Sequence, residues 1–230
     1  MRRKTMDNLV LLSGGMDSAT ALGLAMKDSP NTMAVSIRYG SVHSDSEAKA
    51  ALAVANWYGL GLHEVCLPHS IFRGGQSSLL GESEIPTEEY HDPEKETPSS
   101  TVVPFRNALF ISVAVAMAEA QGCARVWLAV HATDHLGFAY PDCSPEFIGS
   151  MLSATYIGTH RKVRLITPFL WISKAQIVRL GMELRVPYQL TWSCYRGGDS
   201  SCGECPTCLE RKKAFAEACY FDPIPYLKEG

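Results

Sequence analysis

The sequence lacks long apolar runs, which bears on where the protein resides. Its longest apolar stretch runs from Ala108 to Ala118 and is interrupted only by Ser112. A helix that crosses a membrane needs about 20 such residues, so this stretch is more typical of a buried helix. The basic residues 2–4 precede an apolar run at 9–12 that is too short for the core of a signal peptide. We therefore expect a cytoplasmic protein with no membrane contact.

The sequence also lacks a large excess of either charge. Its 230 residues carry a formal net charge of −3, with 46% hydrophobic and 20% charged residues. These values are ordinary for a globular domain with a sizeable core, and they give no global field that would attract nucleic acid. The basic clusters at 160–164 and 211–213 are small against this background. The composition favours a small-molecule substrate over nucleic acid.

Two familiar phosphate-binding motifs are absent from the glycine-rich stretch near the N-terminus. A Walker A loop needs a second glycine followed by Lys and Ser/Thr, whereas Gly15 is followed by Met16, Asp17 and Ser18. A dinucleotide fingerprint needs a third glycine that is missing here. Both motif classes are therefore excluded.

The same stretch nevertheless has the features of a phosphate-binding loop. Leu9 to Leu12 form an unbroken apolar run, which is typical of a strand that is buried on both faces. Ser13, Gly14 and Gly15 then form a turn before a helix-compatible segment. Glycines let backbone N–H groups approach an anion, and the start of a helix adds partial positive charge. We interpret this turn as a phosphate cradle; a turn that only joins strand to helix is the alternative.

Strand-like and helix-like segments alternate along the chain, which predicts a doubly wound α/β fold. The expected strands lie at residues 9–12, 33–37, 63–67, 125–130 and 163–167. The expected helices lie at residues 19–27, 44–58, 105–121, 145–156 and 174–184, with Pro104 in the first turn of the third. The prediction is a mostly parallel five-stranded sheet in a domain at residues 1–190, followed by a zinc-binding C-terminal segment at 191–230 that packs on this domain.

Residues 68–102 interrupt this alternation. Prolines and glycines are scattered through them, and the part from Glu82 to Glu96 is strongly acidic. We expect an inserted, solvated surface loop that supplies no core element. A lid over an active site is the alternative, because long loops in compact domains often have a function.

Four of the eight cysteines crowd into a short C-terminal stretch. Cys194, Cys202, Cys205 and Cys208 follow the pattern C-x7-C-x2-C-x2-C, with glycines and a proline between them. Four thiolates at this spacing can reach one tetrahedral metal, and zinc is the expected ion. Such a closed site is structural, and it would hold a segment that lacks a core of its own. An iron–sulfur cluster and disulfides are the alternatives, and the other four cysteines are expected to be small core residues.

Residues 13–18, SGGMDS, resemble the loop of the PP-loop N-type ATP pyrophosphatases, which split ATP between the α and β phosphates. With the four cysteines, they make the chain similar to the 7-cyano-7-deazaguanine synthases of the queuosine pathway, the QueC family. Further motifs agree over nearly the whole length: Tyr39-Gly40 with His43 and Glu47, Val103 to Asn107, Asp134-His135, Tyr140 to Phe147, Ser173-Lys174 and Thr191 to Tyr195. The resemblance implies an adenine nucleotide alpha hydrolase-like fold and a homodimer.

The resemblance also implies an ATP-dependent ligase reaction. In the family, 7-carboxy-7-deazaguanine and ammonia are joined through an adenylated carboxylate to give an amide, and a second activation dehydrates the amide to the nitrile. Adenylation is needed because a carboxylate is a poor electrophile, whereas AMP is a good leaving group. The implied cofactors are ATP, Mg²⁺ with the triphosphate and a structural Zn²⁺.

Individual residues take their expected roles from the matched motifs. The nucleotide is expected to bind the loop of Leu12, Ser13, Gly14, Gly15, Met16, Asp17 and Ser18. The candidate catalytic residues are charged or titratable: Asp17, Arg106, Lys174, Asp134 and His43. The candidate substrate-binding residues are Arg106, Asp134, His135, Tyr140 and Asp142. The carboxylates of Asp134 and Asp142 can accept hydrogen bonds from a guanine-like base. A salt bridge that anchors its helix is the alternative for Arg106, and a structural role is the alternative for each histidine.

Four positions depart from the family's pattern and leave the end point of the reaction open. Ser41 and Val42 replace a Gln-Arg pair, Phe105 replaces a glycine, and Ser144 replaces a frequent arginine. With two arginines missing, the alternative is a QueC-like enzyme that stops at the amide or conjugates the activated deazaguanine to another amine, such as a protein's. A tRNA-modifying adenylase is a lesser alternative, and a non-enzymatic zinc module that binds nucleic acid is another.

Overall fold

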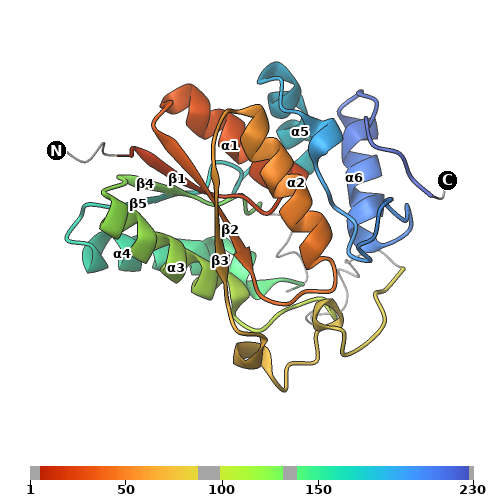
Figure 1. Cartoon of the computed structure of the whole chain (residues 1–230), viewed down its shortest axis with the longest axis horizontal. Helices are drawn as coiled ribbons and strands as arrows, with labels where there is room; N and C mark the ends of the chain where they lie inside the picture. Colours follow the sequence, from red (N-terminus) through yellow and green to blue (C-terminus); the bar gives the residue numbers. More distant parts are fainter. Residues whose placement is uncertain (1–5, 88–98, 132–138, 228–230) are drawn as a thin grey trace.

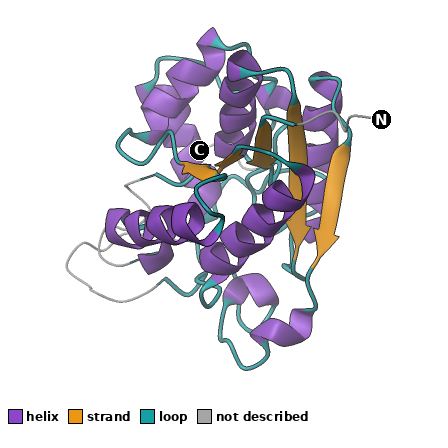
Figure 2. Cartoon of the chain, turned by 90° about the vertical axis from the view of Figure 1, so that its left-hand side faces the viewer, coloured by secondary structure: helices purple, strands orange, loops and turns teal. Residues whose placement is uncertain are grey.

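Five parallel strands form the central sheet of the computed structural model, which describes residues 6–87, 99–131 and 139–227. The strand order is β3-β2-β1-β4-β5, and every pair is parallel. The strands are β1 (Asn8–Leu11), β2 (Thr32–Arg38), β3 (Leu62–Cys66), β4 (Arg125–Trp127) and β5 (Arg164–Ile166). The long strand arrows in Figure 2 point in the same direction. The predicted five-stranded parallel α/β fold is confirmed.

Helices cover both faces of this sheet (Figure 1). One face carries α1 (Met16–Asp28), α2 (Ser44–Trp57), α5 (Lys174–Glu183) and α6 (Pro206–Glu217), and the other carries α3 (Arg106–Gln121) and α4 (Pro145–Gly158). Helices α1, α2, α3 and α4 pack on the strands, as in doubly wound folds, whereas α5 packs mainly on α1 and α6 mainly on α5. Among the described residues, no helix combines the length and apolar composition needed to cross a membrane.

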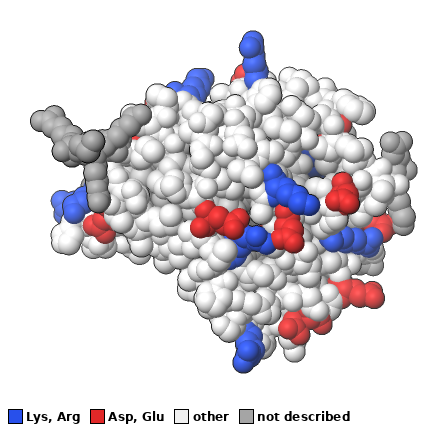
Figure 3. All heavy atoms as spheres, in the orientation of Figure 1, with Lys and Arg blue, Asp and Glu red and all other residues white. Residues whose placement is uncertain are grey.

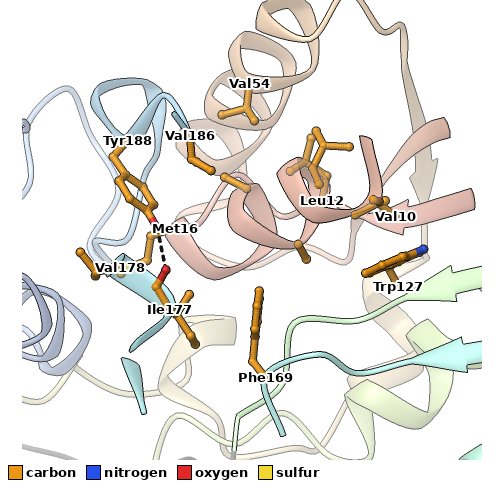
Figure 4. Packing of buried hydrophobic residues seen from close by; sticks show 14 of the residues in the cluster. Val10, Leu12, Met16, Val54, Trp127, Phe169, Ile177, Val178, Val186 and Tyr188 are labelled. Carbon is orange, nitrogen blue, oxygen red and sulfur yellow. Dashed lines mark hydrogen bonds between the residues drawn. The ribbon is translucent and has the colours of Figure 1, made fainter. Parts of the chain in front are cut away.

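The residues of β1 alternate between the two cores. Leu9 and Leu11 pack with α3 and α4, whereas Val10 and the following Leu12 pack with α1, α2, α5 and α6. Figure 4 shows Val10, Leu12 and Phe169 in the core that is formed with α1, α2, α5 and α6. Because both faces of β1 are covered, all of its positions are buried, which explains the unbroken apolar run in the sequence.

The strand order reverses between β1 and β4. From β1 the chain proceeds outward to β2 and β3, and it then returns to β4 on the other side of β1. In open parallel sheets, ligands bind beyond the carboxyl ends of the strands at this reversal. The loop after β1 and the residues after β4 are therefore the expected edges of a site.

The prediction that residues 68–102 form a solvated loop without a core element is wrong. This segment contains two short 3-10 helices, η1 (His69–Phe72) and η2 (Ser78–Leu80). Their side chains Phe72, Leu79 and Leu80 are buried in one cluster with Tyr39 and Val103. The rings of Phe72 and Tyr39 meet edge to face at 5.9 Å. A few apolar residues thus make a small core that the polar average composition hides. Residues 88–98, the most acidic part, lie outside the described residues.

The C-terminal segment contributes residues to a core that it shares with the helices of the sheet. Helix α6 places Ala214 and Phe215 in the same core as α1 and α5. The first half of this helix is polar and carries Cys208, so its periodicity does not stand out in the sequence. The boundary at residue 190 stays a prediction, but the segment beyond it shares the core of the sheet.

The remaining differences are local. Helix α3 begins at Arg106, so Pro104 precedes the helix, and Phe105 caps it with a left-handed φ of 54°. Cys66 and Cys219 are exposed rather than part of the core, whereas Cys123 and Cys143 are buried as predicted. On the face seen in Figure 3, basic and acidic side chains lie interspersed.

Candidate active site

Side-chain hydroxyls shape the loop after β1. Ser13 and Ser18 hydroxyls lie 3.1 Å apart, the Ser13 N–H donates to Ser18 Oγ at 3.2 Å, and Ser18 Oγ donates to the Gly15 carbonyl at 3.0 Å. The Gly15 N–H donates to Ser13 Oγ at 3.3 Å. These bonds fold residues 13–18 into a fixed turn around the start of α1.

Gly14 is required in this turn for two reasons. Its φ is +90°, which favours glycine. A Cβ on Gly14 would lie 2.5 Å from the Glu47 carbonyl oxygen and 2.7 Å from the Ala51 nitrogen of α2. The loop therefore packs against α2 with no room for a side chain.

The start of α1 is left open to a ligand. Gly15 is the N-cap residue and supplies no side-chain hydrogen bond, so the first-turn N–H groups lack the usual cap. The partial positive charge of a helix start attracts anions. This geometry fits the predicted phosphate cradle.

A cavity of about 250 Å³ opens at the reversal point of the strand order. It is bounded by the loop after β1, the ends of β2 and β4, the starts of α2, α3 and α5, and residues 192–195. The predicted site residues that line it are Leu12, Ser13, Gly15, Met16, Asp17, Ser18, His43, Arg106, Tyr140 and Lys174. Segments distant in sequence thus meet at one cavity.

Lys174 lies between two carboxylates at this cavity. Its Nζ is 2.6 Å from Glu210 Oε2 and 3.4 Å from Asp17 Oδ2. His131, which follows β4, places Nε2 3.8 Å from Asp17 Oδ2. Asp17 Oδ1 is buried without a hydrogen-bond partner among the described residues. Asp17 therefore faces the cavity with an unsatisfied acceptor beside a cation.

Glu210 and His131 are site residues that sequence reasoning missed. His131 lies just beyond the carboxyl end of β4, after residues 128–130. Its position at the end of a central strand was the available signal. Glu210 comes two residues after Cys208. No local pattern ties it to Lys174, because α5 and α6 meet only in the folded chain.

Arg106 is held among aromatic rings at the first turn of α3. Its Nη1 donates to the Tyr39 hydroxyl at 3.3 Å, and its guanidinium lies 5.8 Å from the Tyr39 ring centroid and 5.9 Å from that of Phe110. Burial raises the pKa of the Tyr39 phenol, so the hydroxyl remains protonated as an acceptor for Arg106. Arg106 is thereby oriented beside the cavity.

Tyr140 and Asp142 occupy different environments. Tyr140 is buried, lines the cavity and hydrogen-bonds to Thr101. Asp142 Oδ2 instead accepts a 2.9 Å bond from the Asn107 N–H at the start of α3, and Asp142 is not among the described lining residues. Its observed contact is that of a helix cap, and its predicted contact with a base stays a prediction.

His43 is almost fully buried and lines the cavity. Its Nε2 lies 3.4 Å from Glu47 Oε2, one turn later in α2, and its ring is 5.1 Å from that of Tyr195. His43 and Glu47, two residues of the same sequence motif, therefore lie close together in the structure. Asp134 and His135 lie outside the described residues.

The four C-terminal cysteines form one buried cluster. Their sulfur atoms all lie within 4.8 Å of one another, with Cys202 and Cys208 at 3.9 Å and Cys205 and Cys194 at 4.0 Å. A tetrahedral zinc with Zn–S bonds of about 2.3 Å separates its sulfurs by about 3.8 Å. Hydrogen bonding with Cys194 and Cys208 lowers the pKa of the Cys205 thiol, which favours a thiolate. The cluster can therefore hold a metal ion.

Backbone contacts tie this cluster to the phosphate loop. The Trp192 N–H donates to the Gly14 carbonyl at 2.9 Å, and Trp192 Nε1 donates to the Cys194 carbonyl at 2.7 Å. Thr207 Oγ1 donates to the Ser193 carbonyl at 2.7 Å. The cysteine cluster thus supports the wall of the cavity that residues 192–195 form.

Arg211 is fully buried, although the sequence suggested a basic surface cluster. It pairs bidentately with Asp222 through Nε and Nη2, both at 2.9 Å, while its remaining N–H groups donate to Thr191, Ser193 and the Tyr188 carbonyl. All five donors are satisfied, as a buried guanidinium requires. Through Arg211, the network links Asp222 to Thr191 and Ser193, next to the cavity wall that residues 192–195 form.

Comparison with protein families decides the relationship of this chain. The family model described as "Queuosine biosynthesis protein QueC" matches residues 7–219. The chain belongs to the QueC family.

Known proteins resemble this QueC-family chain over nearly its full length. A 7-cyano-7-deazaguanine synthase of Thermoplasma volcanium is 41% identical over 225 residues, covering 96% of this chain and 90% of the relative. One from Methanoculleus marisnigri is 42% identical over 219 residues, covering 94% and 96%. A solved structure, the predicted subunit of a tRNA methyltransferase from Methanocaldococcus jannaschii, matches with a TM-score of 0.50 and 15% identity over 97% of this chain and 94% of that one. The last likeness concerns the fold alone.

Proposed function

We propose that this chain is an ATP-dependent ligase that converts 7-carboxy-7-deazaguanine and ammonia to 7-cyano-7-deazaguanine through adenylated carboxylate and amide intermediates. The observation that carries the proposal is the cavity of this QueC-family chain, where the uncapped start of α1 meets Lys174 and Arg106. Relatives at 41% and 42% identity are named for the cyano product. Transfer of AMP to a carboxylate needs an anion-binding loop for the phosphates and cations that offset negative charge, and this cavity has both.

The loop at 12–18 binds the phosphates that leave as pyrophosphate. The uncapped start of α1 faces the cavity, and its N–H groups stabilise charge that develops as the α–β bond breaks. Lys174 supplies a point charge beside Asp17, and Arg106 supplies a planar fork suited to a carboxylate or a phosphate.

The deazaguanine base is assigned to the part of the cavity near Tyr140. Tyr140 lines the cavity, and its hydroxyl is fixed by Thr101. Asp134, His135 and Asp142 remain proposed partners for the N–H edge of the base, because carboxylates pair well with adjacent N–H donors.

Two metals belong to the proposal. Mg²⁺ accompanies the triphosphate. Asp17 Oδ1, which has no hydrogen-bond partner among the described residues, is an oxygen ligand of the type that Mg²⁺ prefers. Zn²⁺ occupies the cysteine cluster, which the sulfur separations of 3.9 and 4.0 Å fit. The same proposal includes ammonia as the nitrogen donor, a homodimer and a cytoplasmic location.

The test combines the purified protein with ATP, Mg²⁺, ammonia and 7-carboxy-7-deazaguanine, and it identifies products by mass. The nitrile with AMP and pyrophosphate is the expected result. Asp17→Asn should lower AMP formation at least about 100-fold, because it removes the charge beside Lys174. Asp45→Asn, the same change at an exposed ion pair with Arg38, is the matched control and should keep full activity. Absence of substrate-dependent pyrophosphate release from the wild type would refute the proposal.

The same assay separates the alternative end points. Ser41, which stands where the family has glutamine, lines the cavity, and the adjacent Val42 brings no positive charge. If this loss limits the second activation, the amide accumulates with one AMP per product. Transfer to another amine, for example on a protein, would instead consume the substrate into a conjugate when that amine is added.

A further inference from the structure

The ring nitrogen Nδ1 of His43 is a buried polar atom without a partner. The side chain is 2% exposed, and Nδ1 makes no hydrogen bond to the residues that the structure describes. Leaving such an atom unpaired costs about 1–3 kcal/mol. Because His43 lines the cavity, a bound molecule is the natural partner for this nitrogen.

The surroundings of His43 set which nitrogen carries the proton. A neutral imidazole has one N–H and one lone pair. The Glu47 carboxylate, 3.4 Å from Nε2, favours the proton on Nε2 and leaves the lone pair on Nδ1. The Tyr195 ring, tilted by 36° at 5.1 Å, packs against the imidazole and fixes its orientation. His43 is therefore arranged to accept a proton through Nδ1.

We propose that His43 is the general base for the nitrogen nucleophile, and that Glu47 is its positioning residue. This inference rests on the proposed function, in which ammonia attacks the adenylated carboxylate. The attack makes the nitrogen positively charged, so a base must remove a proton before the amide forms. Imidazole is well matched to this task near neutral pH.

The step balances as follows. The lone pair of ammonia forms the N–C bond at the carbonyl carbon, and Nδ1 of His43 takes one proton from that nitrogen. The C–O bond to the phosphate of AMP then breaks, and its electron pair leaves with AMP. The products are the amide, AMP and a protonated His43, which Glu47 stabilises until the proton passes to solvent.

The carboxylates of the cavity are less suited to this role. Asp17 and Glu210 both form ion pairs with the Lys174 ammonium, and taking up a proton would weaken those ion pairs. Carboxylates are in general weaker bases than imidazole by about two pKa units. His43 lines the cavity and combines a ring nitrogen that has no partner among the described residues with an adjacent carboxylate that stabilises its protonated form.

The test separates the two chemical halves of the reaction in His43→Asn, which retains a polar group but cannot take up the proton. We expect substrate-dependent exchange of pyrophosphate into ATP within about twofold of wild type, and ammonia-dependent amide formation lower by about 10²–10⁴-fold. Hydroxylamine attacks without a base at neutral pH, so hydroxamate formation should persist. Glu47→Gln should show the same pattern with a smaller loss.

Controls make each outcome decisive. His63→Asn places the same substitution at an exposed position of β3 and should keep all three activities. Circular dichroism checks folding, and His43→Gln replaces His43→Asn if the latter does not fold. Amide formation at the wild-type rate overturns the inference, as does parallel loss of exchange, amide and hydroxamate in a folded variant. A wild type without any exchange would instead refute the proposed function.

Discussion

At the scale of single residues, the phosphate loop depends on the backbone of Gly14. The left-handed φ of +90° and the close approach of α2 both exclude a side chain. The Trp192 N–H holds the Gly14 carbonyl from the other side. The loop is therefore fixed between α2 and the C-terminal segment before any nucleotide binds.

Replacing Gly14 tests this close packing. Gly14→Ala adds a Cβ at 2.5 Å from a carbonyl oxygen and should lower the free energy of unfolding by about 2–5 kcal/mol. Gly59→Ala is the control, because Gly59 also has positive φ, +69°, but no atom within 4 Å of a Cβ; it should cost about 1 kcal/mol. Urea unfolding measures both, and equal losses would contradict the packing argument.

The sequence revealed residues that belong to a continuous motif and concealed those that act across the fold. Residues 13–18 and the cysteines were found because their spacing carries the chemistry. Arg211 sits beside Lys212 and Lys213, which suggests a basic surface, yet its five donors are satisfied in the interior. Burial and partner identity arise only when distant segments meet.

At the scale of elements, the cysteine cluster and α6 support the cavity wall. Helix α6 supplies Cys208, Glu210 and the buried Phe215 from one continuous segment. Trp192, which precedes the cysteine cluster in the C-terminal segment, contacts the phosphate loop through its N–H. Metal binding at the cluster is therefore expected to stabilise both the fold and the site.

Removing one sulfur tests this expectation. Cys205→Ser should reduce bound zinc, lower Tm by more than about 10 °C and weaken substrate-dependent pyrophosphate exchange. Cys66→Ser, at an exposed free cysteine, should change none of these quantities. Metal analysis, thermal unfolding and the exchange assay check the three effects. Full zinc content and unchanged exchange in Cys205→Ser would contradict the coupling.

The sequence predicted most elements but not all. The strands and five of the helices were placed because their apolar periodicity is strong and their ends carry turn residues. η1, η2 and α6 were missed because their buried residues are few and stand among polar ones. In each case a tertiary contact, rather than a local preference, decided the structure.

At the scale of the whole molecule, the strand order creates the site. β1 and β4 are neighbours at the point where the strand order reverses, so the loops that follow them face one cavity. Arg106 and Lys174 enter the cavity from α3 and α5, which lie on opposite faces of the sheet. The fold thereby brings an anion cradle and two cations together, which suits transfer of AMP to a carboxylate.

The most direct test of this account follows the oxygen atoms of the substrate. The carboxylate of 7-carboxy-7-deazaguanine is labelled with oxygen-18 at both positions, and the nucleotide products are analysed by mass spectrometry. Because each activation transfers AMP to a substrate oxygen, the account predicts two AMP molecules per nitrile, each with one labelled phosphate oxygen, and unlabelled pyrophosphate. Formation of ADP with label in inorganic phosphate, or of AMP without label, would contradict it.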